Sequence, residues 1–309
     1  MARMHVLSLL QVVFILSACS AQAFAEPAPE IPDRLKTVLS EAKTHYDAGR
    51  LPQAMALYDD VLSEVPDLAA ALVARGACRM KLNEFEPAIM DFTRAIELDP
   101  DNQAAYGARA TAWANVKRPD KALPDFDQII RLRPNDANSY VVRGVTKANL
   151  GKPLAALADV DVALSLEPGN AKTHVVRGMI WQAVKQFVAA RIAFESAVRA
   201  DAASLEGHNK LALLLVTCPD ASLRDYIRGI EHARECCKLT DYKQWQHLAM
   251  LGTAYAQAGQ FSEAIKWQQS ALDSAPAEAK PALEQRLALY REGKVFYKIA
   301  SPPPRTTNL

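Results

Sequence analysis

The sequence predicts an all-α fold, a solenoid of stacked helix hairpins, because three features recur at one interval. A small residue recurs every 34 positions, at Ala42, Gly76, Ala110, Gly144, Gly178 and Ala212. A second series of small residues keeps this interval, at Ala54, Ala88, Ala122, Ala156 and Ala190. Prolines keep it too, at Pro66, Pro100, Pro134 and Pro168. About 34 residues is the length of one helix-turn-helix unit in a solenoid, and such units stack on their neighbours.

Each recurring position has a physical reason within a hairpin. Two antiparallel helices approach closely only where side chains are small, so we expect Gly76 on the first helix to face Ala88 on the second. A larger residue fills the space beyond this contact, at Tyr58, Phe92, Phe126, Val160 and Phe194. Proline then ends the second helix, because it lacks the N–H and restricts the residue before it.

The repeats resemble the tetratricopeptide repeat (TPR) family, most clearly between residues 75 and 102. The matching residues are Arg75-Gly76, Ala88, Asp91-Phe92, Ala95 and Leu98-Asp99-Pro100-Asp101-Asn102. The resemblance implies a right-handed superhelical solenoid of about seven repeats, which start near residues 35, 69, 103, 137, 171, 205 and 245. It weakens at Ala202, where a proline is expected, and in the sixth repeat, which runs 40 residues to the seventh.

This numbering divides the chain after its N-terminal segment. We expect five regular repeats at 35–204, the extended sixth and the seventh repeat at 205–278, and a capping helix at 279–298. Leu283, Leu287 and Tyr290 share one face of that helix, which would cover the apolar end of the last repeat. Residues 299–309, with three consecutive prolines, are predicted to be a disordered tail.

The sixth and seventh repeats also resemble a C-terminal block of bacterial secreted repeat proteins. The matching segments are Leu211–Leu215, Cys218-Pro219-Asp220, Arg224-Asp225 and Trp267-Gln268. This resemblance implies a bacterial origin and adds nothing about chemistry.

Residues 1–25 are predicted to be a signal peptide, with Arg3 before a short apolar run from Val6 to Leu16. Two cleavage sites compete. Leu16-Ser17-Ala18-Cys19 resembles a lipobox, in which Cys19 is lipidated, whereas Ala23-Phe24-Ala25 would release a protein that begins at Glu26. In either case we expect export to the bacterial cell envelope or periplasm, and residues 26–34 form a flexible linker.

The later cysteines are Cys78, Cys218, Cys236 and Cys237. An even number in an exported protein allows a disulfide. However, Cys218 should end the first helix of the sixth repeat, and Cys236 should lie at the opposite end of the antiparallel pair, beyond disulfide reach. Buried free thiols are therefore the preferred interpretation, although the extra residues of this repeat leave a disulfide open.

Charge is nearly balanced, with 36 Lys and Arg against 35 Asp and Glu. No basic stripe for nucleic acid is therefore expected. Arginines recur at Arg75, Arg109, Arg143 and Arg177, and aspartates follow the first three by sixteen residues, at Asp91, Asp125 and Asp159. Structural ion pairs are the simpler interpretation. Anion binding is the alternative, mainly at Arg177, because Ala193 stands where its aspartate would be.

No motif for catalysis, phosphate binding or metal binding is found, so we expect no enzyme activity, cofactor or metal. His174 and His208 hold equivalent places in adjacent repeats, about one helix spacing of ~8–10 Å apart. Two histidines without a nearby carboxylate or cysteine at ligand spacing make a poor metal site.

TPR proteins bind peptides or helices along a concave face formed by the first helices of their repeats, and this resemblance implies a partner-binding groove. Its predicted residues are Val73, Ala77, Thr111, Asn115, Val141, Val145, Asn149, Val175, Met179 and Gln182. A basic clamp for acidic peptides is absent, since its positions hold Leu39, Ala74 and Ala108. The alternative is that neighbouring helices cover the valines and that these residues bind nothing.

The predicted function is a non-enzymatic protein–protein interaction scaffold in the bacterial cell envelope, whose partner is a protein or peptide. Membrane contact would occur only through a lipid at Cys19. The alternative is an accessory subunit of an envelope enzyme or transport complex, bound through the convex face or the extended sixth repeat. The insertion between Cys218 and Arg228 favours this alternative.

Overall fold

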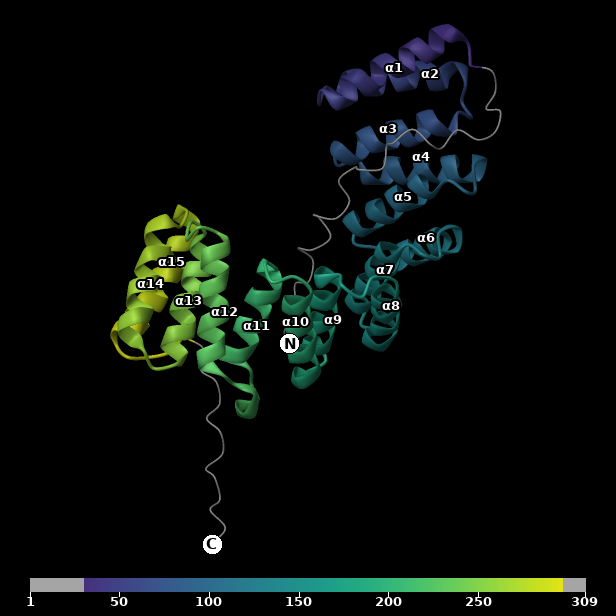
Figure 1. The fold of residues 1–309 in the computed structure, drawn as a ribbon. Helices are drawn as coiled ribbons and strands as arrows, with labels where there is room; N and C mark the ends of the chain where they lie inside the picture. The colour runs from purple at the N-terminus through teal and green to yellow at the C-terminus, as the bar shows by residue number, and fades with distance from the viewer. Residues whose placement is uncertain (1–30, 297–309) are drawn as a thin grey trace. The chain divides into compact units, whose positions relative to one another are not determined.

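The computed structural model describes residues 31–296, and this part of the chain contains α-helices and two short 3-10 helices but no strand (Figure 1). The α-helices are α1 Asp33–Asp47, α2 Leu51–Glu64, α3 Ala69–Lys81, α4 Phe85–Leu98, α5 Gln103–Asn115, α6 Pro119–Leu132, α7 Ala137–Asn149, α8 Pro153–Leu166, α9 Ala171–Ala183, α10 Phe187–Ala200, α11 Leu205–Thr217, α12 Tyr226–Leu239, α13 Trp245–Gln257, α14 Phe261–Ser274 and α15 Lys280–Arg291. The predicted signal peptide with Cys19, most of the predicted linker and the predicted tail lie outside the described residues.

The chain forms two compact units, which meet in sequence between Lys152 and Pro153. We call the odd-numbered helices α1 to α13 the first helices, and the even-numbered helices α2 to α14 the second helices. In unit 1, each first helix from α1 to α5 packs on the second helix that follows it, and α3 lies beside α1 and α5. In unit 2, α9, α11 and α13 pack in the same way, with α11 beside α9 and α13 and with α15 on α14. The prediction of an all-α fold of helix hairpins with a capping helix is confirmed.

At Gly76 and Gly178, the recurring small residue is a glycine because an aromatic ring occupies the space next to it. A Cβ on Gly76 would lie 2.6 Å from the ring of Phe92, and one on Gly178 would lie 2.4 Å from the ring of Phe194. Both rings are completely buried. The glycine and the aromatic residue of one repeat are therefore a single packing contact between its two helices.

The helix ends follow the sequence pattern. Each recurring proline stands two residues beyond the end of a second helix, as Pro100 does after α4 ends at Leu98. Asn102, Asn170 and Ser204 then begin first helices, and their side chains accept hydrogen bonds from backbone N–H groups three residues on. This capping satisfies donors that the first turn of a helix leaves free.

The extra residues of the sixth repeat pack against α11. They include a 3-10 helix at Ala221–Leu223, and the side chain of Leu223 is buried. The backbone N–H of Asp225 donates to the carbonyl of Leu215 at 3.0 Å, and the Arg224 Nε donates to the carbonyl of Cys218 at 2.8 Å. The insertion is thus tied to the end of α11.

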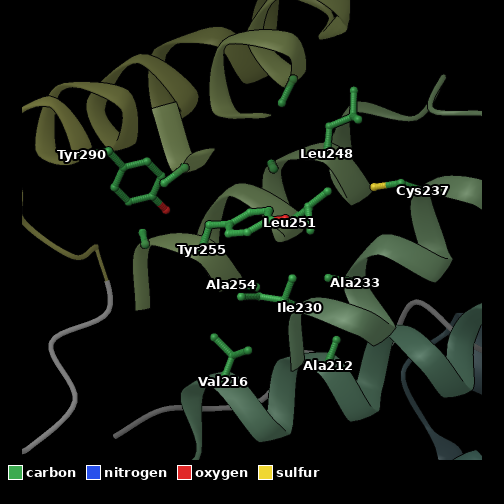
Figure 2. Packing of buried hydrophobic residues seen from close by; sticks show 14 of the residues in the cluster. Ala212, Val216, Ile230, Ala233, Cys237, Leu248, Leu251, Ala254, Tyr255 and Tyr290 are labelled. Atoms are coloured by element: carbon green, nitrogen blue, oxygen red, sulfur yellow. The ribbon is translucent and has the colours of Figure 1, made fainter. Parts of the chain in front are cut away.

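The largest apolar cluster joins α11 to α15 (Figure 2). Tyr290 of α15 is 1% exposed, and its hydroxyl lies 3.2 Å from the Thr253 Oγ1 of α13. The buried amide of Gln268 in α14 donates to the backbone carbonyl of Leu283 at 3.0 Å. The capping helix therefore covers the last repeat through apolar contacts and buried hydrogen bonding.

Candidate interaction surface on the first helices

The arginine series ties neighbouring repeats of unit 1 together. Arg75 on α3 contacts Asp59 of the preceding repeat at 2.7 Å and Asp91 of its own repeat at 2.6 Å. Arg109 on α5 contacts Asp125 through two nitrogens, the closer at 2.6 Å. The side chains of Asp91 and Asp125 are 4% and 1% exposed, so these are structural ion pairs within the fold.

The later arginines also have carboxylate partners on the preceding second helix. Arg143 lies 2.7 Å from Asp127 in unit 1, and Arg177 lies 3.7 Å from Asp161 in unit 2. Arg177 also lies 3.3 Å from the Nδ1 of His174. Its guanidinium is therefore engaged within the fold, which removes the observation that favoured anion binding.

The two equivalent histidines each lie within hydrogen-bond distance of a backbone carbonyl in the loop before their helix. The Nε2 of His174 lies 2.9 Å from the carbonyl of Pro168, and the Nε2 of His208 lies 3.1 Å from that of Ala202. The remaining nitrogen of His208 lies 2.9 Å from the Nδ1 of His232 on α12. Within residues 31–296, no three histidine, cysteine or acidic side chains are grouped to hold a metal ion.

The four cysteines of the described region are buried free thiols. The Sγ of Cys236 lies 3.6 Å from the carbonyl of Leu205, at the start of α11, whereas Cys218 follows the end of that helix. These two thiols therefore lie at opposite ends of α11. Burial raises the pKa of Cys236 to about 12 and that of Cys78 to about 11, so the reactive thiolate is disfavoured.

The predicted groove residues lie on first helices of both units. Val73 and Ala77 are on α3, Thr111 and Asn115 on α5, Val141, Val145 and Asn149 on α7, and Val175, Met179 and Gln182 on α9. Asn115 and Asn149 are exposed, and all the others except Val175 are half-buried. The half-buried side chains leave part of their surface accessible on α3, α5 and α7 in unit 1, and on α9 in unit 2.

Val175 is a correction to the predicted set. Its side chain is 2% exposed and belongs to an apolar cluster with Leu211 and Leu214 of α11. Because the neighbouring first helix covers it, Val175 is a core residue. Asn115 is also partly engaged, since its amide donates to the carbonyl of Thr111 at 2.9 Å.

The sequence did not predict a cavity of about 440 Å³ in unit 2. It is lined by the N-terminal parts of α9 and α11, by the loop before α11, and by His247 of α13. His247 is 9% exposed, and burial lowers the pKa of its ring. The sequence offered little indication of this site, because the extra residues of the sixth repeat shift α13, and with it His247, out of the 34-residue series.

None of the helices in the described part of the chain is long and apolar enough to span a membrane.

Two family models for tetratricopeptide repeats match the chain, at residues 69–102 and 219–279. The chain is a tetratricopeptide repeat protein. Repeat arrays of this kind present an extended surface to other proteins. This TPR protein is therefore a protein–protein interaction scaffold.

Solved structures share the fold of this TPR protein at low sequence identity. A tetratricopeptide repeat protein from Parabacteroides merdae ATCC 43184 is 13% identical, with a TM-score of 0.57 over 84% of this chain and 100% of the other. MamA, from residue 41 to its end, from Desulfovibrio magneticus RS-1 is 17% identical, with a TM-score of 0.52 over 56% and 98%. YrrB, described as a TPR protein with an unusual peptide-binding site, is 20% identical, with a TM-score of 0.50 over 55% and 88%. No curated protein matches the chain.

Proposed function

We propose that this TPR protein binds an extended or helical segment of another protein along its first helices, without catalysing a reaction. The accessible valines of α3 and α7 carry the proposal. Val73, Val141 and Val145 are half-buried, so each leaves part of its apolar surface accessible. Apolar contacts from such residues stabilise a bound segment by about 25 cal/mol per Å² of surface removed from water.

Exposed amides add polar contacts to the same helices. Asn149 is exposed on α7, in the same helix as two of the valines, and Asn115 is exposed on α5. A side-chain amide offers a donor and an acceptor, which matches the backbone of an extended peptide. YrrB, which has the same fold, is described as having a peptide-binding site, and this also supports the proposal.

A comparison of two variants of unit 1 tests this surface. Val141→Glu combined with Val145→Glu places two charges on the first-helix surface, whereas Met90→Glu changes a 72% exposed side chain on the second helix α4. In-cell crosslinking followed by pull-down from the envelope fraction should lose its enriched protein with the double variant and keep it with Met90→Glu. Equal capture by the native protein and the double variant would exclude binding through α7, provided that helical content is unchanged.

For its location, we propose export to the bacterial cell envelope, with Cys19 lipidated or with cleavage before Glu26. The apolar run and the lipobox-like segment in the sequence support this proposal. Mass spectrometry of the mature N-terminus distinguishes the outcomes. A lipid mass on Cys19 supports a membrane anchor, an N-terminal Glu26 supports a free periplasmic protein, and an uncleaved Met1 contradicts export by either route.

A second candidate function uses the second helices of unit 2, as an accessory subunit of an envelope complex. Leu154, Val188 and Ile227 are each the second residue of α8, α10 and α12, and they are 78%, 51% and 74% exposed. The equivalent residues of α4 and α6 are Glu86 and Asp120. Replacing the three aliphatic residues by glutamate should abolish complex formation if this surface is used, and should leave capture unchanged if the first helices are used.

A further inference from the structure

The cavity of unit 2 combines acidic side chains with a buried histidine. Its polar lining includes Lys172 of α9, Asp201 and Ser204 of the loop, Glu206 and Asn209 of α11, and His247 of α13. Three first helices thus contribute to one hollow of about 440 Å³, which has room for a single side chain of a partner. The charged side chains and the histidine indicate what kind of group fits there.

His247 is the observation that points to a ligand. It is more than nine-tenths buried, it lines the cavity, and it has no hydrogen-bond partner among the described residues. Its ring nitrogens are not among the buried side-chain atoms that lack a hydrogen-bond partner, so they remain accessible, and a ligand in the cavity can bind one of them. Burial lowers the pKa of His247, so the ring is neutral at pH 7 and offers one acceptor nitrogen.

The charges around the cavity favour a cation. Asp201 and Glu206 both line it, and neither forms an ion pair within residues 31–296. Asp201 accepts a hydrogen bond from the N–H of Ala203 at 2.9 Å through one oxygen, so its second oxygen is open to a ligand. Lys172 is the cationic residue in the lining, and with His247 neutral the formal charge is −1.

We propose that this cavity binds a basic side chain of the partner segment, with arginine as the best fit. A guanidinium carries five N–H donors in one plane, and the cavity offers acceptors on Asp201, Glu206, Asn209 and His247. A carboxylate or phosphate would instead face two unpaired carboxylates and one lysine. The inference rests on the proposed function, since it names the chemistry of the segment that the first helices bind.

Selection of a displayed library of random twelve-residue peptides on the purified protein tests this inference. Enriched peptides should share an arginine or lysine at one position. Replacing that residue by norleucine should weaken binding about tenfold, which corresponds to about 1.4 kcal/mol. The Glu206→Gln variant should weaken binding to a similar degree, and Glu231→Gln, which changes an exposed carboxylate on α12 outside the cavity, should leave it unchanged.

The other outcomes separate this inference from the proposed function. In one outcome, the enriched peptides lack a basic residue or share an acidic one, and their binding is lost in the Val141→Glu, Val145→Glu variant. This outcome would overturn the proposal for the cavity and would support binding through the first helices. Basic peptides that bind Glu206→Gln as tightly as the native protein would also overturn it. If no peptide is enriched, or if none depends on the first helices, both proposals are wrong.

Discussion

At the scale of single residues, the fold depends on a few close contacts between large and small side chains. Gly76 lies against Phe92, and an added methyl group would come within 2.6 Å of the ring. Phe92 is completely buried, so the ring has no free space into which it can move. The small residue of the 34-residue series is therefore a glycine at Gly76 and Gly178 because a buried phenylalanine packs directly against each of them.

Replacing Gly76 by alanine should destabilise the protein. Overpacking costs about 1–3 kcal/mol, which outweighs the gain in helix propensity of about 1 kcal/mol. Gly169→Ala is the matched control, because no atom lies within 4 Å of a Cβ there and its φ is not in the left-handed region. Urea unfolding should show a lower midpoint for Gly76→Ala alone, and equal midpoints for the two variants would contradict the packing argument.

A second residue-scale prediction concerns pH. Burial, together with the neighbouring His208 and Arg228, lowers the pKa of His232 from 6.5 to about 4. Between pH 6.5 and pH 4, His232 is protonated in the unfolded chain but stays neutral in the folded protein. The contribution of neutral His232 to the free energy of unfolding is therefore fully present above pH 6.5 and is lost as the pH falls toward 4.

The free energy of unfolding measured between pH 7 and pH 4.5 should therefore fall less steeply for His232→Asn than for the native protein. Gln53→Asn, a change of an exposed side chain on α2 that does not titrate, is the control and should keep the native slope. Identical slopes for all three proteins would show that His232 titrates in the folded state as it does in the unfolded state.

At the scale of helices and repeats, the hairpins could be predicted because three side-chain types recur at one interval. The turns between first and second helices could not be predicted in the same detail. The turns have a left-handed backbone conformation at Asn83, Lys117 and Lys185, as they do at Gly49 and Gly151. Only the glycines indicate this conformation in the sequence, because glycine adopts it without steric cost. The division into two units between α7 and α8 also leaves no signal, since the repeat interval continues through it.

The candidate site was predicted in part. The sequence places the predicted residues on first helices, but it does not say how far the next first helix covers them. Val175 is buried for this reason, while Val141 in the equivalent position remains half-buried. His247 was not predicted, because the extra residues before α12 interrupt the 34-residue interval and its position has no equivalent in the regular repeats.

The buried ion pairs between helices lead to a prediction at this scale. Burial raises the pKa of Asp125 despite the hydrogen bond from Arg109, so removing this carboxylate from water is costly. Asp125→Ala removes the carboxylate partner of Arg109, which keeps only the Thr93 hydroxyl, and should destabilise the protein by about 3 kcal/mol. Asp120→Ala on the same helix breaks an exposed pair with Arg118 and should cost much less stability than Asp125→Ala.

Replacing both partners should restore most of the stability. Arg109→Met with Asp125→Leu substitutes apolar side chains for a buried pair, a change that is often neutral. Thermal unfolding of the single and double variants gives the comparison. A double variant as unstable as Asp125→Ala would show that the pair has a role beyond satisfying its own charges.

At the scale of the whole molecule, the protein is an array of similar hairpins, and the described helices pack against their neighbours within each unit. Function then depends on the surfaces that the array leaves accessible. The first helices offer half-buried valines, exposed amides and one acidic cavity, whereas the second helices of unit 2 offer exposed aliphatic side chains. The two proposed modes of binding use different helices and can be separated by experiment.

Hydrogen exchange of the protein with and without its crosslinked partner tests the central claim most directly. Binding along the first helices should slow exchange of the backbone amides of α3, α5, α7 and α9, and leave α4 and α10 unchanged. Protection confined to α8, α10 and α12 would contradict the account and assign the partner to the second helices.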